Sequence, residues 1–468
     1  MLRKREDVLI LDPRFGDRKA VKVFSSQVWL AALLLIGTFA LAGCGSHKKA
    51  TPKPRVVVTP AAAQLSWFMR KLNAGVAPPQ VEILAHFSPT FLKAVSTTQI
   101  LESLAPFSAE RPFRLESLLP GAKPLGLAAR YRSRNGTTIR VDLSVTKSSP
   151  HRIVGLRLQL VPTRFSSWNA IDRAFARLGS QSSYLAAEVK DGKLRTIHAL
   201  SSDRAGAIGS AFKLYVLGAL GQAIETGQAS WSETLAIRDA WKSIPSGTMQ
   251  DQPAETRWTL QHYARQMISI SDNTATDHLI HRLGRANVER EFVRFGNRAA
   301  ARDVPLLTTR ENTILKINAS ASLRNAYARA GSAERLRLLA RVDATPLSLQ
   351  GVSWNAPIDI GTIEWFASPA DLGRALVGLA KLSTRPGLAP VRSILAVNPG
   401  LLFNRSTWPY VGYKGGSEAG VLSGAWYLER ADGRVFVMTY VLNDPRHLID
   451  DLASSALAEA AIARLAYS

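Results

Sequence analysis

The chain has 468 residues, of which 46% are hydrophobic and 20% are charged. This length exceeds one ordinary domain of about 100 to 200 residues, and the composition can bury enough apolar surface to exclude wholesale disorder. The single cysteine, Cys44, excludes an intramolecular disulfide, an iron–sulfur cluster and the usual thiolate zinc site. The net charge of +23 would attract polyanions, but no long basic run or basic–aromatic motif typical of nucleic-acid-binding modules is present. We therefore expect about two or three folded units and no nucleic-acid partner.

The N-terminal segment has the pattern of a secretion signal. Val28–Ala42 is uncharged and mostly apolar, follows basic residues, and leads into the sequence LAGC that ends at Cys44. It is shorter than the roughly 20 residues of a membrane span and has the size of a signal-peptide core. LAGC resembles a bacterial lipobox, which implies that Cys44 is acylated and becomes the mature N-terminus; an uncleaved anchor is the alternative. We expect residues 1–43 to be a leader and signal peptide, and residues 44–62 a lipidated tether and linker in a bacterial cell envelope, facing the periplasm or exterior.

Residues 63–163 show helical spacing followed by strand-like runs. Apolar residues recur at helical intervals in stretches that begin near Leu65, Val81 and Ile100, which predicts three short helices. The four strand-like runs, separated by turn residues, are 113–119, 127–132, 137–146 and 152–161. This order predicts an α+β domain with helices on one side of a four-stranded antiparallel sheet. It resembles an NTF2-like (cystatin-like) cone. The strands contain no acid–histidine pair, which favours a structural or binding role toward an unknown protein partner.

A candidate nucleophile–base pair lies in the second part of the chain. From residue 165 the pattern gives a helix, two strand candidates and then Ser210-Ala211-Phe212-Lys213. Apolar residues after Ser210 recur with helical spacing, so Ser210 and Lys213 lie one turn apart on one helix face. A lysine can accept the serine proton when burial and nearby positive charge destabilise its own charge. Alone, the pattern S-x-x-K occurs by chance in many proteins.

Two further motifs strengthen this interpretation. Ser271-Asp272-Asn273 stands between two helical runs. There, Ser271 could relay a proton, Asn273 could hold the lysine and a substrate amide, and Asp272 could cap local backbone. The sequence KGGS begins at Lys414 on a strand, where an edge position would present a fixed positive charge to a substrate carboxylate and the glycines would allow close approach. A glycine-rich hairpin with a solvated lysine is the alternative for this third motif.

In this order, S-x-x-K, S-D-N and K-G-G resemble the motifs of the serine penicillin-recognising superfamily, and of class A β-lactamases in particular. The resemblance covers residues 165–468 and implies a β-lactamase-like α/β/α-layered domain with an antiparallel sheet. A cone followed by such a hydrolase also looks like a two-domain lipoprotein and clavulanate-cluster group within this superfamily. By the resemblance, the catalytic residues are Ser210, Lys213 and Ser271, and the substrate-binding residues are Asn273, Lys414 and Ser417.

The resemblance also assigns chemical roles. Ser210 would be the acylated nucleophile, Lys213 its base, and Lys414 the anchor of the substrate acid. The backbone N–H groups of Ser210 and Ser417 would form the oxyanion hole, aimed at the carbonyl oxygen as it becomes negative.

Two departures from the class A pattern concern deacylation and substrate binding. Class A enzymes carry an Ω-loop glutamate that activates the deacylating water, and counting back from Ser368-Pro369 places this position at Gly351 or Val352, where no acid is present. We therefore expect deacylation to be slow. Glu364 is a possible deacylation base, and a salt bridge that closes the loop is its alternative role. Gly415 replaces the usual hydroxyl residue after the lysine, which removes one hydrogen bond to a substrate carboxylate unless Ser417 supplies it.

Two other segments have no assigned chemistry. Residues 304–342 form an insertion with three helical runs, for which a lid and a packing surface are both plausible. His278 and His281 lie near Asp277 on a predicted helix, but two histidines at i and i+3 without a third ligand are more often ordinary helix residues. We expect no metal and no cofactor.

These observations predict a membrane-anchored serine hydrolase that forms an acyl-enzyme on carboxylate-bearing amides or esters, with β-lactams favoured over other small-molecule or peptidoglycan-derived substrates. One alternative is a D-alanyl-D-alanine carboxypeptidase or esterase acting on envelope substrates, which turnover of a muropeptide but not of a β-lactam would select. The other is a non-catalytic envelope-binding protein, which failure to trap an acyl adduct at Ser210 would favour.

Overall fold

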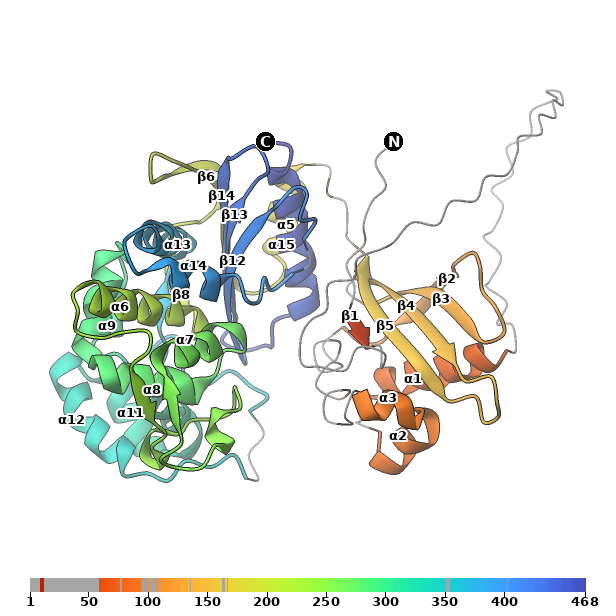
Figure 1. Ribbon diagram of the computed structural model, residues 1–468, viewed down its shortest axis with the longest axis horizontal. Coiled ribbons are helices and arrows are strands. Elements are labelled where there is room, and N and C mark those ends of the chain that lie inside the picture. The colour runs from red at the N-terminus through yellow and green to blue at the C-terminus, as the bar shows by residue number, and fades with distance from the viewer. Residues whose placement is uncertain are drawn as a thin grey trace. The chain divides into compact units, whose positions relative to one another are not determined.

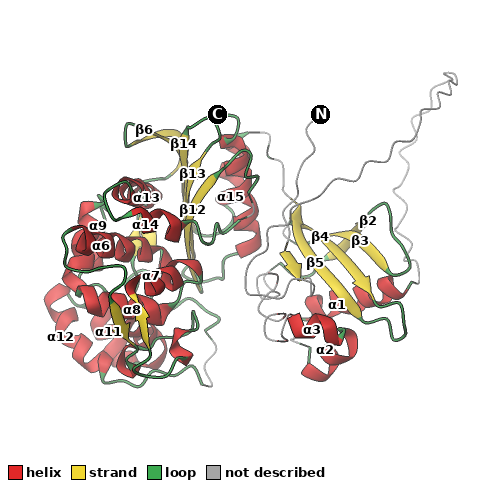
Figure 2. Ribbon diagram, in the orientation of Figure 1, coloured by secondary structure: helices red, strands yellow, loops and turns green. Residues whose placement is uncertain are grey.

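The computed structural model describes residues 9–11, 59–75, 78–94, 97, 100, 107, 110–134, 136–161, 165, 167–350, 354–401 and 403–468. The chain divides into two compact units, Val8–Val161 and Pro162–Ser468. Each is a mixed α+β unit with helices packed on an antiparallel sheet (Figures 1 and 2). The predicted signal sequence and Cys44 lie outside the described residues. Among the helices that the structure describes, none is long and apolar enough to cross a membrane.

The N-terminal unit packs its helices on a five-stranded sheet. Helix α1 (Pro60–Ala74) buries Leu65, Phe68 and Leu72 on one face, because these residues recur at helical spacing. Its other helices are α2 (Gln80–His86) and α3 (Pro89–Ala94). In sheet order, the strands are β1 (Leu9–Leu11), β5 (Ile153–Val161), β4 (Thr138–Val145), β3 (Gly126–Arg132) and β2 (Arg114–Leu118).

The four strands predicted in this unit are present, and two details differ from the prediction. The stretch that begins at Val81 forms two helices, because Phe87 is extended and Pro89, with its fixed φ, begins the next helix. Strand β1 adds a fifth strand at the sheet edge, where Leu9 pairs with Leu158. Most of the stretch predicted to be helical from Ile100 lies outside the described residues. The likeness to an NTF2-like cone stays a prediction.

The C-terminal unit has a five-stranded antiparallel sheet with β12 at one edge. In sheet order, its strands are β12 (Tyr410–Glu418), β13 (Val421–Glu429), β14 (Val435–Asn443), β6 (Gln181–Lys190) and β7 (Lys193–Leu200). The central strand β14 is apolar along nearly its whole length because both of its faces are covered. Phe436 and Met438 face helices α5 (Trp168–Phe175) and α15 (Asp451–Leu465), whereas Val437 packs toward α13 (Pro369–Ser383).

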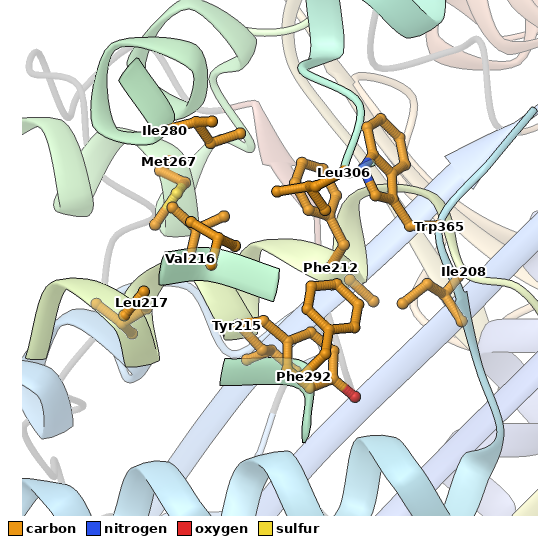
Figure 3. Packing of buried hydrophobic residues seen from close by; sticks show 14 of the residues in the cluster. Ile208, Phe212, Tyr215, Val216, Leu217, Met267, Ile280, Phe292, Leu306 and Trp365 are labelled. Atoms are coloured by element: carbon orange, nitrogen blue, oxygen red, sulfur yellow. The ribbon is translucent and has the colours of Figure 1, made fainter. Parts of the chain in front are cut away.

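A helical layer lies beyond α13 and is centred on α6 (Lys213–Glu225) (Figure 1). Every residue of α6 from Lys213 to Gly221 is buried, as expected for a helix that is apolar around its whole circumference. In the same core, Phe212 stacks on Trp365 with ring centroids 3.9 Å apart, and Tyr215 stacks on Phe292 at 3.8 Å (Figure 3). The other α-helices of this layer are α7 (Leu260–Ser269), α8 (Asn273–Leu283), α9 (Arg285–Arg294), α10 (Thr309–Thr313), α11 (Ala321–Arg329), α12 (Ser332–Asp343) and α14 (Ala389–Leu395).

Short elements connect these helices to the sheet. The predicted helical runs of the insertion are confirmed as α10 continued by η6, α11 and α12. The two-stranded ladders are β8 (Gly206–Ala207) with β11 (Phe366–Ala367) and β9 (Thr234–Ala236) with β10 (Arg257–Thr259). The short helical turns are the 3₁₀ helices η2 (Gly209–Phe212), η3 (Asp239–Trp241), η4 (Met249–Asp251) and η5 (Ala300–Asp303), and the π-helix η6 (Ile314–Asn318).

Candidate active site

Ser210 lies in the 3₁₀ turn η2, directly before the buried helix α6. The strand that leads into this turn is held by Asn443, whose side-chain oxygen accepts from Ala207 N at 2.8 Å and whose side-chain nitrogen donates to Ala207 O at 2.9 Å. Ser423 Oγ donates to Ile208 O at 2.6 Å. The half-buried Ser210 therefore has a backbone that β13 and β14 fix in place.

Lys213 has no exposed surface, and its ammonium group contacts the second motif. Nζ donates to Ser271 O at 2.6 Å and to Asn273 Oδ1 at 2.7 Å, and it lies 3.1 Å from Ser271 Oγ. Burial lowers the pKa of Lys213 to about 7, although Asp272 and Asp277 partly oppose this shift. A large fraction of Lys213 is therefore neutral at neutral pH and able to accept a proton.

The S-D-N segment combines a strained residue with a helix cap. Ser271 has φ of 59°, a left-handed conformation that costs a non-glycine residue about 1 to 3 kcal/mol and is concentrated at functional sites. Asp272 caps α8 by accepting from Ala275 N at 2.8 Å, and its other oxygen accepts from Thr248 N at 2.7 Å. These contacts match the predicted capping role of Asp272, and they hold Ser271 and Asn273 on either side of it.

Lys414 brings the third motif to the same place. It lies on the edge strand β12 and is only 4% exposed, which excludes the alternative of a solvated hairpin lysine. Its Nζ lies 3.0 Å from Ser271 Oγ and donates to Gly415 O at 2.6 Å. Burial and the neighbouring Lys213 lower the pKa of Lys414 well below its usual range. The structure thus places both lysines of the predicted site beside one hydroxyl group.

Backbone atoms of the nucleophile turn pack directly against β12. A Cβ atom on Gly416 would lie 2.6 Å from Ser210 N and 2.1 Å from Ile208 O, so only glycine fits there. A Cβ atom on Gly209, whose φ is +49°, would lie 3.3 Å from Ser417 N. These close approaches bring the amide groups of Ser210 and Ser417 to one place, as an oxyanion hole requires.

Gly415 is explained by a neighbour that the sequence analysis missed. A Cβ atom at Gly415 would lie 2.1 Å from the hydroxyl oxygen of Tyr413, so a hydroxyl side chain here would have to displace the Tyr413 ring. The Tyr413 ring is held by stacking on Trp426, with ring centroids 4.8 Å apart. Since side chains two residues apart share one face of a strand, the sequence Y-x-G already placed this aromatic residue beside the glycine. Ser417, the other hydroxyl residue considered, is exposed.

Glu364 is buried and its two carboxylate oxygens have partners. Oε1 accepts from Lys316 Nζ at 2.8 Å, while Oε2 accepts from Trp365 N at 3.1 Å and from Gly209 N at 3.3 Å. These contacts favour the salt-bridge role over that of a deacylation base, because both oxygens already have partners and the side chain has no exposed surface. The Ω-loop positions Gly351 and Val352 lie outside the described residues.

Lys316, Glu418 and Asn443 are further neighbours of the site whose roles the sequence did not reveal. Lys316 and Asn443 belong to no short motif, and Glu418 directly follows the KGGS sequence but has no role assigned there. The one available signal was the sequence ILKIN at residues 314–318, in which a lysine flanked by apolar residues indicates burial of a charge.

The nitrogen atoms of His278 are both engaged within the fold. Nδ1 lies 2.7 Å from Thr274 O, and Nε2 accepts from Arg238 N at 2.8 Å. His281 instead stacks on Trp241. Burial lowers the pKa of His278 to about 4, so the ring is neutral near pH 7. Among the described residues, no three histidine, cysteine, aspartate or glutamate side chains cluster as a metal site would require.

Comparison with known families identifies the class of protein that this fold and site define. Residues 166–467 match the beta-lactamase enzyme family, and because they make up more than half of the chain, the protein belongs to this family. It is a serine β-lactamase-like hydrolase. Residues 56–149 match a second family, described as the ORF 12 gene product N-terminal domain, consistent with an additional N-terminal domain.

Solved structures to which this chain is similar include β-lactamases and PBP-A. A β-lactamase from Sphaerobacter thermophilus is 18% identical, with a TM-score of 0.46, and the match covers 64% of this chain and 99% of that chain. A putative class A β-lactamase, PenP from Rhodopseudomonas palustris, is 17% identical, with a TM-score of 0.44 and coverages of 64% and 98%. PBP-A is 16% identical, with a TM-score of 0.43 and coverages of 66% and 99%. No match to a curated protein was found.

Proposed function

We propose that this protein is a lipid-anchored serine hydrolase of the bacterial cell envelope that forms an acyl-enzyme through Ser210. Its favoured substrates are β-lactams, among other amides and esters that carry a carboxylate. The observation that carries this proposal is the buried Lys213, whose Nζ lies between Ser271 and Asn273 with a pKa of about 7. A buried lysine whose pKa is near 7, and which follows a candidate nucleophilic serine by three residues, is suited to act as a general base.

In this proposal, acylation uses these groups in sequence. Neutral Lys213 accepts the proton of Ser210 Oγ as that oxygen bonds to the substrate carbonyl carbon. The carbonyl oxygen becomes negative and is stabilised by the N–H groups of Ser210 and Ser417. Ser271 then passes a proton to the leaving nitrogen as its bond to carbon breaks. The contact of Ser271 Oγ with Lys213 supports this relay, since it allows the proton to return from the base.

Substrate recognition rests on Lys414 and Asn273. Lys414 offers an ammonium group to a substrate carboxylate, and Asn273 orients a substrate amide. Burial and Lys213 disfavour the charge of the free Lys414, and a bound carboxylate would favour it again, because an opposite charge nearby raises the pKa of a lysine. The Tyr413 ring and Gly415 leave this edge of β12 without the usual side-chain hydroxyl.

Deacylation is the slow step of this proposal. It needs a base beside a water on the far side of the ester, and the groups around Lys213 serve acylation instead. Glu364 has both oxygens engaged, and no acid occupies the stretch between Asp343 and Asp359. We therefore propose that the covalent intermediate accumulates.

A substrate panel tests the proposal against its alternatives. Purified protein is incubated separately with a cephalosporin, a peptide ending in D-alanyl-D-alanine and a small carboxylate-bearing ester, and the product released from each is quantified over time. The proposal predicts a burst of cephalosporin opening stoichiometric with protein, followed by slow turnover. Rapid release of D-alanine or alcohol without a β-lactam burst would select the carboxypeptidase or esterase instead. No reaction with any of them would favour the binding protein.

A further inference from the structure

A buried cluster of one lysine and two glutamates borders the two candidate oxyanion donors. Lys316 comes from the π-helix η6 within the insertion, and its Nζ lies 2.8 Å from Glu364 Oε1 and 2.5 Å from Glu418 Oε1. The side chains of Lys316 and Glu364 have no exposed surface, and that of Glu418 is 10% exposed. A π-helical turn is uncommon and is often found at functional sites.

The cluster is connected to the residue next to each donor. Glu364 Oε2 accepts from the backbone N–H of Gly209, which directly precedes Ser210. Glu418 directly follows Ser417 on β12. Through Glu364 and Glu418, Lys316 therefore links Gly209, which precedes the donor Ser210, to the residue that follows the donor Ser417.

Other contacts hold the two segments on the side of the sheet: Asn443 and Ser423 bind the chain before Ser210, and β13 pairs with β12. Among the strands that the structure describes, β12 is hydrogen-bonded only to β13, so its outer edge has no partner among them. Gly209 has a φ of +49°, which glycine adopts without strain, and its N–H donates to Glu364 Oε2. An ion pair removed from water is strong and directional when its geometry is good, but its desolvation cost makes it a poor general stabiliser. Such a cluster is therefore better suited to fixing geometry than to adding stability.

The charges of the cluster are balanced when Glu418 carries a proton. Burial and the neighbouring Glu364 carboxylate raise the pKa of Glu418 well above its usual range. Glu364 and Lys316 then form a neutral pair, and Glu418 remains bound to the lysine through its oxygen. A glutamine at position 418 preserves this arrangement, whereas a leucine of similar size does not.

We propose that Lys316 and Glu418 are positioning residues that hold the Ser210 and Ser417 amides at the separation needed to bind an oxyanion, with the insertion supplying the lysine. This inference rests on the proposed acyl-transfer function. It gives residues 304–342 a supporting role in catalysis, in place of the two roles that the sequence left open. It further implies that damage to the cluster slows acylation while substrate binding is retained.

The test compares Glu418→Gln with Glu418→Leu in the full-length protein. The acylation rate constant and the dissociation constant of the non-covalent complex are obtained separately by rapid-quench mass spectrometry over a range of cephalosporin concentrations. We expect Glu418→Gln to acylate within about threefold of the parent. Since removal of one oxyanion donor costs about 100- to 1,000-fold, we expect Glu418→Leu, which only misplaces a donor, to slow acylation by at least about tenfold with little change in the dissociation constant. Lys316→Met should likewise slow acylation with little change in the dissociation constant.

Arg337→Ala is the matched control, because Arg337 forms an exposed ion pair with Glu334 on α12 of the same insertion. It should leave the acylation rate unchanged. If Lys316→Met fails to fold, the comparison of Glu418→Gln with Glu418→Leu still tests the inference, since Lys316 and Glu364 remain paired in both variants. Equal acylation by the glutamine and leucine variants, with or without a lower melting temperature for leucine, would overturn the inference. A parent protein that never acylates would instead overturn the proposed function.

Discussion

The ammonium group of Lys213 donates a hydrogen bond of 2.7 Å to Asn273 Oδ1, and both side chains are buried. Sixty positions separate these residues along the chain. Their contact is possible because α6 and α8 begin at the same place, where Ser210 and Ser271 also lie. The contact with Asn273 orients the lysine nitrogen, and burial disfavours its positive charge.

The first prediction is that acylation depends on pH through Lys213. Below a pH of about 7 the lysine is protonated and cannot accept the serine proton, so the acylation rate constant should fall roughly tenfold per pH unit; above it, the rate should level off. Acylation rates of the parent between pH 5 and 9 give the profile. Lys213→Met should lower the acylation rate nearly to that of Ser210→Ala. The double variant should be no slower than either single variant, because nucleophile and base act as one unit. A flat profile in the parent would contradict the assignment of Lys213 as the base.

Lys381→Met is the control for removal of a lysine, since Lys381 is exposed near the end of α13. We expect its pH profile and rates to match those of the parent.

The second prediction concerns the contact between the nucleophile turn and β12. A Cβ atom at Gly416 would lie 2.1 Å from Ile208 O, so Gly416→Ala must push the strand away from the turn. We expect acylation to fall by at least about 100-fold, comparable to the loss of one oxyanion donor. Gly361→Ala is the control, because a Cβ atom at Gly361 has no neighbour within 4 Å. Equal acylation by the two variants would show that the amides of Ser210 and Ser417 do not act together.

The third prediction is that a carboxylate on the Ω loop speeds deacylation. Val352→Glu, or Gly351→Glu, places an acid where counting back from Ser368-Pro369 puts the class A glutamate. We expect the slow phase after the cephalosporin burst to accelerate in one of these variants while the burst amplitude stays the same. Val352→Gln and Gly351→Gln control for side-chain size. If the glutamate and glutamine variants turn over equally slowly at both positions, the absence of a general base on the Ω loop does not explain slow deacylation.

The fourth prediction separates the two roles considered for Glu364. Breaking a buried ion pair on one side typically costs about 3 to 5 kcal/mol, so Glu364→Ala should lower the free energy of unfolding substantially. We expect Glu364→Gln, which keeps the shape and can still accept hydrogen bonds, to retain the parent's deacylation rate. Urea unfolding and the decay of the isolated acyl adduct give the two quantities. A folded Glu364→Gln protein whose adduct decays at least about tenfold more slowly would identify Glu364 as the deacylation base.

The fifth prediction concerns the lipid anchor. If Cys44 carries lipid, the parent should sediment with membranes and Cys44→Ala should be released or mislocalised. Membrane fractionation followed by immunoblotting of both forms provides the measurement. A Cys44→Ala protein that stays membrane-bound with an intact leader would contradict the lipobox interpretation.

Much of the fold was predictable because its elements carry local signals. Strand-like runs predicted β2 to β5, and helical spacing predicted α6 and the helices of the insertion. The break between α2 and α3 depends on Phe87 and Pro89, and the periodicity around them continues across it. For this reason the pattern alone predicted one helix there.

The candidate site was predictable only where its residues belong to motifs. Ser210, Ser271 and Lys414 are far apart in the chain, and their order identified them before any contact was known. Lys316 lies in no motif and 102 positions before Glu418, which follows the KGGS sequence, so the fold alone brings the two together. Asn443 is likewise recognisable only from its two hydrogen bonds to Ala207.

The most direct test of the account is the mass of the intact protein after reaction with a cephalosporin and rapid removal of the free compound. The account predicts one added mass per chain, carried by the peptide that contains Ser210 and lost in Ser210→Ala. It also predicts that the adduct persists after the free cephalosporin is gone, because deacylation lacks a placed base. Cephalosporin hydrolysis with no adduct, or an adduct that remains in Ser210→Ala, would contradict the acyl-enzyme at Ser210.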